Sequence, residues 1–175
     1  QQLLTGRARL QGFSGNWQVG RFGDLCSPRS KRMDPRVAGG GDYCIELEDL
    51  ESGTGRCVGS STTSKTSSLK TQFETNDVLF GKLRSYLRKS WLADRAGVCS
   101  TEIWALAPAV GMASPRFVAQ LVRTDDFINA SSVSYGTHMP RSDWSIVAKL
   151  ELAFPEFDEQ EAIANVLSDM DDEIE

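Results

Sequence analysis

The fold is decided near the C-terminus, by the stretch Lys149-Leu-Glu-Leu-Ala-Phe154 and the proline that follows it. Apolar residues alternate with other residues along this stretch, and a period of two predicts a strand with one buried face. Pro155 would end the strand, because proline has no backbone N–H to donate to a neighbouring strand. The buried face is expected to consist of Leu150, Leu152 and Phe154.

An amphipathic helix is expected directly after this strand. Asp158 is a favourable N-cap, and Glu161 three residues later completes a pattern of the capping-box type. Apolar residues then recur at spacings of 4, 3 and 4, which is the a/d spacing of a coiled coil. The same spacing suits a short helix that packs on its own domain, so a subunit interface and a core position are both open for Ile163, Leu167, Met170 and Ile174.

Other elements can be predicted upstream of this strand and helix. Buried strands are expected at residues 77–80 and 101–106, and a short alternating strand at 43–47. Ser114-Pro115 predicts a helix start, because Ser accepts from first-turn amides and Pro lacks only an amide that would be unpaired. Residues 17–25 read as a strand and turn whose apolar residues enter the core: Trp17, Val19, Phe22 and Leu25.

Two long segments, residues 26–41 and 52–68, are expected to be loops. The first is interrupted by Pro and Gly, and the second consists almost wholly of Gly, Ser, Thr and Lys. For the second segment, a structure that becomes ordered only against a ligand is an open alternative to a long loop. Together with the predicted strands and helices, this organisation indicates the α+β class. The expected architecture is a globular domain with a mixed β-sheet and a C-terminal amphipathic helix that starts a coiled coil.

The composition is that of an ordinary globular domain. The chain has 175 residues, of which 40% are hydrophobic and 25% charged, and this is enough to bury a core. No apolar run approaches the ~20 residues of a membrane span. The first residues show no basic region followed by an apolar one, as a signal peptide would. A cytoplasmic location is therefore expected.

The charges are distributed unevenly along the chain. All 19 Lys and Arg residues fall within residues 1–150, which also hold 14 acidic residues and so carry a net charge of +5. Residues 151–175 hold the other 10 acidic residues and no basic residue. A basic body suits a polyanionic partner, although a charge of this size is also compatible with a merely solvated surface. The acidic end is expected to face a different partner.

The few cysteine and histidine residues argue against a metal site. Cys26, Cys44, Cys57 and Cys99 lie far apart in the sequence, and His138 is the single histidine. Zinc sites in proteins use closely spaced pairs of these residues. Reduced thiols and no bound metal are the expectation.

Motifs of enzymes are present only in imperfect form. Residues 59–66 approach the phosphate loop G-x-x-x-x-G-K-[ST], but Ser64 stands where the second glycine lets the backbone wrap a phosphate. A nucleotide-binding enzyme using Lys65 is thus a weak alternative. Residues 42–46 resemble the acid pair of some nucleases, but Glu48 stands where a Lys is needed. His138 lacks an obvious orienting acid, so we expect no catalysis by this chain.

Residues suited to binding nucleic acid are better represented. Lys and Arg pair with phosphates, an Arg can make a bidentate contact to guanine, and short hydroxyl side chains can enter a groove. For Arg84 and Arg141 a structural salt bridge is an equal alternative, and for Tyr86, Trp91 and Trp144 core packing is favoured over base contact. The candidate DNA-binding residues are Arg29, Lys31, Arg32, Ser60, Thr62, Lys65, Lys82, Arg84, Tyr86, Lys89, Ser134, Thr137, His138 and Arg141.

The order of several short motifs resembles a known family. The segments 2–25, 77–86, 97–102, 134–141 and 152–172 are similar, in order and spacing, to a target recognition domain of type I restriction-modification specificity subunits. They include Asp77-Val-Leu-Phe-Gly-Lys-Leu-Arg84-Ser-Tyr86 and Ser134-Tyr-Gly-Thr-His-Met-Pro-Arg141. The resemblance indicates the second recognition domain of such a subunit, with stubs of its flanking helices.

The resemblance implies a division of the chain and a set of partners. Residues 1–16 would lead in from a preceding helix, 17–156 would form the recognition domain, and 157–175 would start a coiled-coil helix. Such a domain reads one half of a bipartite double-stranded DNA target. Methyltransferase subunits that use S-adenosylmethionine, and a restriction motor subunit that uses ATP and Mg, would be directed to it, while this chain binds no cofactor.

Two further expectations accompany this interpretation. The bases would be read by the segments that the resemblance does not cover, residues 27–37 and 59–70, together with the loop at 134–141. The alternative from another class of function is a protein–protein docking module that acts through the acidic helix at 158–174.

Overall fold

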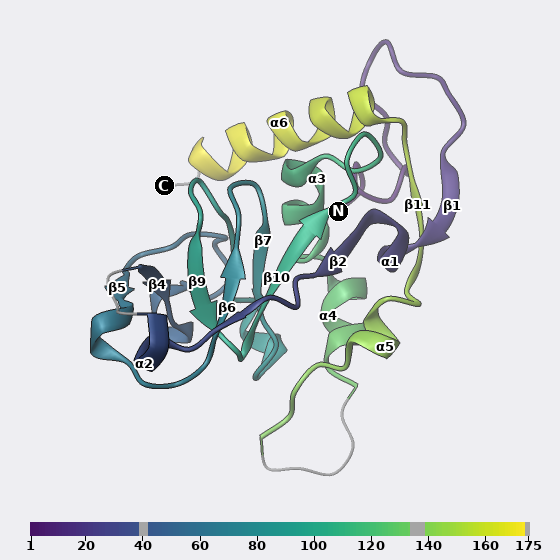
Figure 1. Ribbon diagram of the computed structural model, residues 1–175. Coiled ribbons are helices and arrows are strands. Elements are labelled where there is room, and N and C mark those ends of the chain that lie inside the picture. The colour runs from purple at the N-terminus through teal and green to yellow at the C-terminus, as the bar shows by residue number, and fades with distance from the viewer. Residues whose placement is uncertain (39–41, 134–138, 174–175) are drawn as a thin grey trace.

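The computed structural model describes residues 1–38, 42–133 and 139–173. Its strands form three sheets of two, four and five strands, and helices cover one side of the four-stranded sheet (Figure 1). Strand β4 (Tyr43–Ile45) pairs in parallel with β9 (Gly97–Ser100), whereas the other named pairs are antiparallel. The α+β class with mixed strand pairing is confirmed.

The four-stranded sheet forms the centre of the molecule. Its order is β2 (Cys26–Pro28), β10 (Ile103–Pro108), β7 (Val78–Gly81) and β8 (Ser90–Leu92). The buried strands predicted at 77–80 and 101–106 are therefore β7 and β10, displaced by one or two residues. They pair with Trp104 opposite Phe80 and Leu106 opposite Val78.

Both faces of this central sheet are buried. Phe80 and Trp104 pack into a cluster on the helical side, and Leu79 and Ile103 pack into a second cluster with the five-stranded sheet. A strand covered on both faces needs apolar residues at every position, not at alternate ones. Val78, Leu79 and Phe80 meet this requirement: all three are apolar and inaccessible to solvent.

The five-stranded sheet has the order β3 (Arg32–Met33), β6 (Lys70–Phe73), β9, β4 and β5 (Ser61–Thr62). Gly97 is required where β9 passes β4, because a Cβ atom there would lie 2.6 Å from the carbonyl oxygen of Tyr43.

The prediction of loops at 26–41 and 52–68 was partly wrong. These segments contain β2, β3, the short helix α2 (Pro35–Ala38), β5 and the 3-10 turn η2 (Thr63–Lys65). Strands of two or three residues carry no periodicity of their own, and they form because a neighbouring strand supplies their hydrogen bonds.

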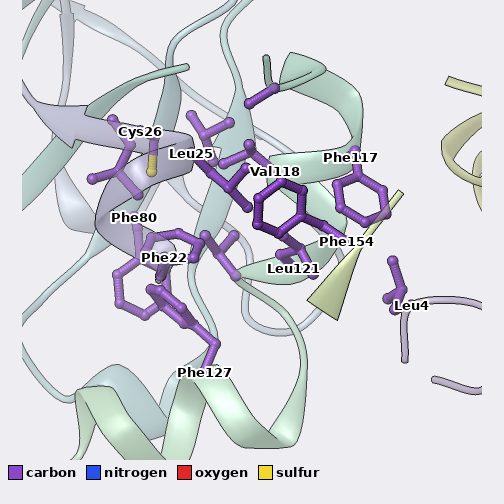
Figure 2. Close-up of a cluster of buried hydrophobic side chains, with 14 of the residues drawn as sticks. Leu4, Phe22, Leu25, Cys26, Phe80, Phe117, Val118, Leu121, Phe127 and Phe154 are labelled. Atoms are coloured by element: carbon purple, nitrogen blue, oxygen red, sulfur yellow. The ribbon is translucent and has the colours of Figure 1, made fainter. Parts of the chain in front are cut away.

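Short helices pack on the other face of the central sheet. They are α1 (Phe22–Leu25), α3 (Pro115–Leu121), α4 (Asp125–Ser131) and α5 (Trp144–Val147). Figure 2 shows their side chains meeting β7, with Phe22, Phe80 and Phe127 close together. The predicted start of α3 is confirmed, because the Ser114 hydroxyl accepts a hydrogen bond from the Phe117 amide at 3.3 Å.

The C-terminal strand forms a separate ribbon with the N-terminal one. Strand β11 (Glu151–Phe154) pairs with β1 (Gln18–Arg21), and Phe154 is buried, as the alternation predicted. Val19 was wrongly expected in the core, since it is 80% exposed. Strand β1 pairs only with β11 among the described strands, and Gln18, Val19 and Arg21 are exposed.

The predicted C-terminal helix is α6 (Phe157–Glu173), which lies along α3 (Figure 1). It begins one residue before Asp158, so Asp158 is not its N-cap. Glu161 does not close a capping box either, because its carboxylate accepts a hydrogen bond from the Ser114 hydroxyl. Gln160 is fully buried: it accepts from the Ser114 amide and donates to the carbonyls of Met112 and Pro155, each at 2.9 Å.

The N-terminal segment is fixed to the same helix. The Arg9 guanidinium donates to both carboxylate oxygens of the buried Glu159, at 2.7 and 2.8 Å, and lies over the ring of Trp17. Leu4 is buried in the helical cluster (Figure 2). Residues 1–16 therefore pack against the rest of the chain.

The four cysteines are free thiols placed in different parts of the core. Cys26 belongs to the cluster on the helical side, Cys99 to the cluster between the sheets, and Cys44 to a small group with Met33 and Val98. Burial raises the pKa of each of these three thiols, that of Cys99 to about 12. Cys57 is half-buried, and burial raises its pKa as well.

Candidate nucleic-acid interface

The end of β7 is joined by backbone hydrogen bonds to a segment far along the chain. The Lys82 amide donates to the Glu102 carbonyl, and the Lys82 carbonyl accepts from the Ser142 amide, both at 2.9 Å. Next to them the Arg84 amide donates to the Pro140 carbonyl at 3.1 Å, and Leu83 forms a bridge with Arg141. The described residues 140–142 are thus held beside the segment 77–86.

Arg141 is paired with an acid at this junction. Its Nε atom lies 3.0 and 2.8 Å from the two carboxylate oxygens of Glu102. The side chain of Arg141 is 51% exposed and that of Glu102 27%. The hydrogen bond to Glu102 raises the pKa of the guanidinium. The salt-bridge alternative for Arg141 is therefore found, although much of its guanidinium still faces solvent.

Lys82 lies in the electrostatic field of the same groups. Partial burial lowers the pKa of its ammonium group, the Glu102 carboxylate opposes this, and the charges of Arg32 and Arg141 lower the pKa further. Arg32 comes from β3, where its guanidinium donates to the hydroxyl of Thr71. We call Arg32, Lys82, Arg84 and Arg141 the basic cluster. Its members come from three separate parts of the sequence: Arg32 and Arg141 act on the charge of Lys82, and the Arg84 amide bonds the residue before Arg141.

The backbone beside the basic cluster adopts an uncommon conformation. Arg84 and Arg88 have positive φ angles of 53° and 52°, and they flank the 3-10 turn η3 (Ser85–Leu87). Left-handed backbone at residues with a Cβ costs about 1–2 kcal/mol each and is often found at functional sites. The turn presents Tyr86, whose side chain is 57% exposed. Core packing was thus the wrong prediction for Tyr86.

Arg84 differs from the other arginines of this region. Its side chain is exposed and makes no ion pair within the described part of the chain. Arg88, by contrast, donates to the Asp125 carboxylate at 2.6 Å and to the Arg123 carbonyl at 2.8 Å. The salt-bridge alternative is therefore not found for Arg84.

Two other candidate residues are occupied by structural contacts. Arg29 donates to the buried Asp77, with Nη2 at 2.9 Å from Oδ1, and this hydrogen bond raises the pKa of the guanidinium. The Lys89 ammonium donates to the Leu47 carbonyl at 2.7 Å. Each side chain thus holds two segments of the chain together, and a DNA contact by either residue stays a prediction.

The remaining candidates lie apart from the basic cluster. Strand β5, with Thr62, is at the opposite edge of its sheet from β3, with Arg32. Ser60, Lys65 and Thr62 are exposed at that far edge, and the Thr62 hydroxyl bonds the Ser64 hydroxyl at 2.6 Å. Lys31 is exposed beside β3. Ser134, Thr137 and His138 lie outside the described residues.

The geometry needed for the weaker enzyme alternatives is not present. A phosphate loop requires a helix after its glycines, whereas residues 59–66 contain only β5 and the turn η2. In the nuclease-like segment, Glu46 accepts from the ammonium of Lys70, which is almost completely buried. Within the described ranges no group of three or more His, Cys, Asp or Glu could hold a metal ion.

Aromatic residues near the site are mainly structural. Trp144 packs edge-on against Phe22 and Trp104, and Trp91 packs edge-on against Phe73. Core packing is thus confirmed for Trp91 and Trp144. The sequence analysis did not single out Glu102 as a site residue, although it lies in a matched segment, because an isolated acid in a basic region carries no pattern.

The residues predicted for a subunit interface have different environments. Ile163 is completely buried in the core of this chain, so it is not available to a second subunit, and its prediction was wrong. Leu167 packs partly against the same core, whereas Met170 is 52% exposed. Ile174 lies outside the described residues.

In the described part of the chain, no helix is long and apolar enough to cross a membrane.

The comparisons with known proteins found similarity to subunits of type I restriction enzymes. No protein-family profile matches it. It is 27% identical over 161 residues to the EcoDI specificity subunit of an Escherichia coli type I restriction enzyme, covering 88% of this chain and 34% of that protein. The chain thus spans about a third of the length of this curated relative.

Two solved structures share the fold. The HsdS subunit from Thermoanaerobacter tengcongensis superposes with a TM-score of 0.76 over 95% of this chain and 44% of its own, at 23% identity. A chain from a study of complex assembly and conformational transition in the type I R-M system superposes with a TM-score of 0.75 over 92% of this chain and 44% of its own, again at 23% identity.

Proposed function

Because this chain is a homologue of type I restriction-modification specificity subunits and shares the fold of the HsdS subunit, we propose that it is a sequence-specific DNA-binding domain of such a subunit. It would read one half of a bipartite double-stranded target. We further propose that residues 17–156 form the recognition domain, that 1–16 lead into it, and that 157–175 start a coiled-coil helix.

The observation that carries the proposal is the basic cluster. Arg32, Lys82, Arg84 and Arg141 come together at the end of β7, although the chain as a whole has a net charge of −5. Positive charges held close together repel one another, and binding a polyanion relieves this repulsion and releases counterions. The exposed Tyr86 adjoins the cluster, in the turn between the left-handed residues Arg84 and Arg88.

The chain itself would not catalyse a reaction. In the proposed complex, methyltransferase subunits use S-adenosylmethionine and a restriction motor subunit uses ATP and Mg. This chain binds no cofactor and directs those subunits to their target. What its own residues supply is charge, shape and hydrogen-bond donors placed on a rigid sheet.

The proposal is tested by selecting bound molecules from a pool of randomised duplexes at low and moderate salt. We expect enrichment of a motif of about three to five base pairs, with affinity falling steeply as salt rises. Arg84→Ala should weaken binding to all sequences and reduce the slope of log K against log salt by about 0.9.

The matched control is Arg95→Ala, which removes an exposed arginine that pairs with Asp94 away from the basic cluster. It should leave the motif, the affinity and the salt slope unchanged. Absence of salt-dependent binding by the unmodified chain would contradict the proposal. Equal losses for Arg84→Ala and Arg95→Ala would place the DNA elsewhere on the surface.

A docking role for α6 is a second candidate function, supported by the exposed Met170 on an acidic helix. Met170→Asp should weaken association with the modification subunit of the same system, measured by sedimentation of the mixed proteins. Asn165→Asp, also at an exposed position of α6, is the control and should bind as the unmodified chain does. Equal binding by both variants would contradict a contact through this face.

A further inference from the structure

The guanidinium of Arg141 is bonded through its Nε atom, whereas its two Nη atoms are left for another partner. Only its Nε atom bonds Glu102, and neither Nη atom makes a hydrogen bond to any residue that the structure describes. An arginine carries five N–H donors in a planar fork, so four donors remain unused. The plane of the fork is meanwhile fixed by two carboxylate oxygens, at 3.0 and 2.8 Å.

The carboxylate is itself fixed in place. Glu102 directly precedes β10, and its backbone carbonyl accepts the Lys82 amide at 2.9 Å, at the end of β7. On the other side, Arg141 bridges to Leu83 through the backbone, and Ser142 bonds Lys82. The backbones of both partners of the ion pair are thus tied by hydrogen bonds to the residues that follow β7.

A fixed arginine fork with its terminal nitrogens free matches one base in particular. Guanine presents two acceptors, O6 and N7, on its major-groove edge, and a bidentate arginine is the commonest specific contact to it. A phosphate can also accept such a fork, but it does not require the fork to be oriented. The acid that orients this fork also weakens the overall attraction to DNA, so the arrangement favours a contact that reads a base over one that only binds a phosphate.

We infer that Arg141 reads a guanine in the DNA target and that Glu102 is the positioning residue that orients it. This inference rests on the proposed function and adds the base that one residue recognises. Lys82, which lies in the field of Glu102 and Arg141, and Arg32, whose charge acts on Lys82, contribute phosphate contacts that carry no sequence information.

Three variants separate these roles. Arg141→Lys keeps the positive charge but lacks the planar fork that Glu102 can orient, so binding should keep its salt dependence while the preference for guanine at one position falls. Glu102→Ala removes a negative charge beside DNA, so overall affinity should rise while the same guanine preference falls. Asp94→Asn, which removes the acid of the exposed pair with Arg95, is the matched control and should change neither.

The measurement is selection from a randomised duplex pool, followed by titration of single duplexes in which each G·C pair of the motif is changed to A·T. For the unmodified chain, one such change should weaken binding by about 5- to 150-fold, and for Arg141→Lys and Glu102→Ala that ratio should approach one. Circular dichroism of each variant confirms that it is folded.

The possible outcomes distinguish the inference from the proposed function. A selected motif that is identical in the unmodified chain, Arg141→Lys and Glu102→Ala overturns the inference and leaves the proposed function intact. If Glu102→Ala raises the affinity for DNA but leaves every base preference unchanged, the carboxylate only repels DNA, and the inference is likewise overturned. An unmodified chain that binds no duplex at either salt concentration overturns both.

Discussion

At the scale of single residues, the charge of Lys82 lowers the stability of the folded protein. Burial and the charges of Arg32 and Arg141 lower its pKa from the ordinary 10.5, and the Glu102 carboxylate only partly compensates. Since the folded pKa is below the unfolded one, the charged lysine destabilises the fold at neutral pH. This penalty disappears as pH rises through the folded pKa towards the unfolded value.

Lys82→Met should therefore stabilise the protein slightly while weakening DNA binding. We expect the free energy of unfolding at pH 7 to rise by less than about 1 kcal/mol, because the group is partly exposed and screened. The gain should shrink as pH approaches 10.5. Urea denaturation across this pH range measures it. Lys149→Met, at an exposed position, is the control, and a loss of stability in Lys82→Met would contradict the argument.

At the scale of elements, Gln160 joins three of them. One buried side chain connects the start of α6 to the end of β11, through Pro155, and to the residues that precede α3, through Met112 and Ser114. The sequence predicted β11 and α6 from the periods of their apolar residues, and the start of α3 from its cap. It did not predict the connection, because a glutamine on a helix has no pattern that indicates partners 46 and 48 positions away.

Gln160→Leu should thus destabilise the protein although it adds apolar volume. The change leaves the Ser114 amide and two carbonyls unpaired in a buried place, and we expect a loss of about 2–4 kcal/mol in the free energy of unfolding. Urea denaturation followed by tryptophan fluorescence measures it. Asn165→Leu, at an exposed position on the same helix, should change stability by less than about 0.5 kcal/mol. Similar values for both variants would show that Gln160 does not connect these elements.

At the scale of the whole molecule, the central sheet makes the layers depend on one another. Helices cover one face through Phe80 and Trp104, and the five-stranded sheet covers the other through Leu79 and Ile103. The apolar runs at 77–80 and 101–106 predicted these strands, since a strand buried on both faces is apolar throughout. The two-residue strands and the basic cluster could not be predicted, because they depend on register between distant segments. The Arg29–Asp77 pair, 48 positions apart, is a further example.

A test of this dependence is to create a cavity on each side of β7 separately. Phe80→Ala should lower the free energy of unfolding by about 3–5 kcal/mol and Leu79→Ala by about 2–5 kcal/mol. Each variant should still unfold in a single transition, seen at the same denaturant concentration by fluorescence and by circular dichroism. Two separate transitions in either variant would show that the layers fold independently.

The distribution of the thiols gives each part of the core its own chemical reporter. Only a thiolate reacts with an alkylating reagent, so a buried cysteine with a raised pKa reacts only when the structure around it opens. Cys26 would report opening on the helical side, and Cys99 opening between the two sheets. Rates of alkylation, resolved by mass spectrometry of peptides, would therefore measure how often each layer opens in the native protein. The comparison can be made with and without DNA, and it needs no engineered label.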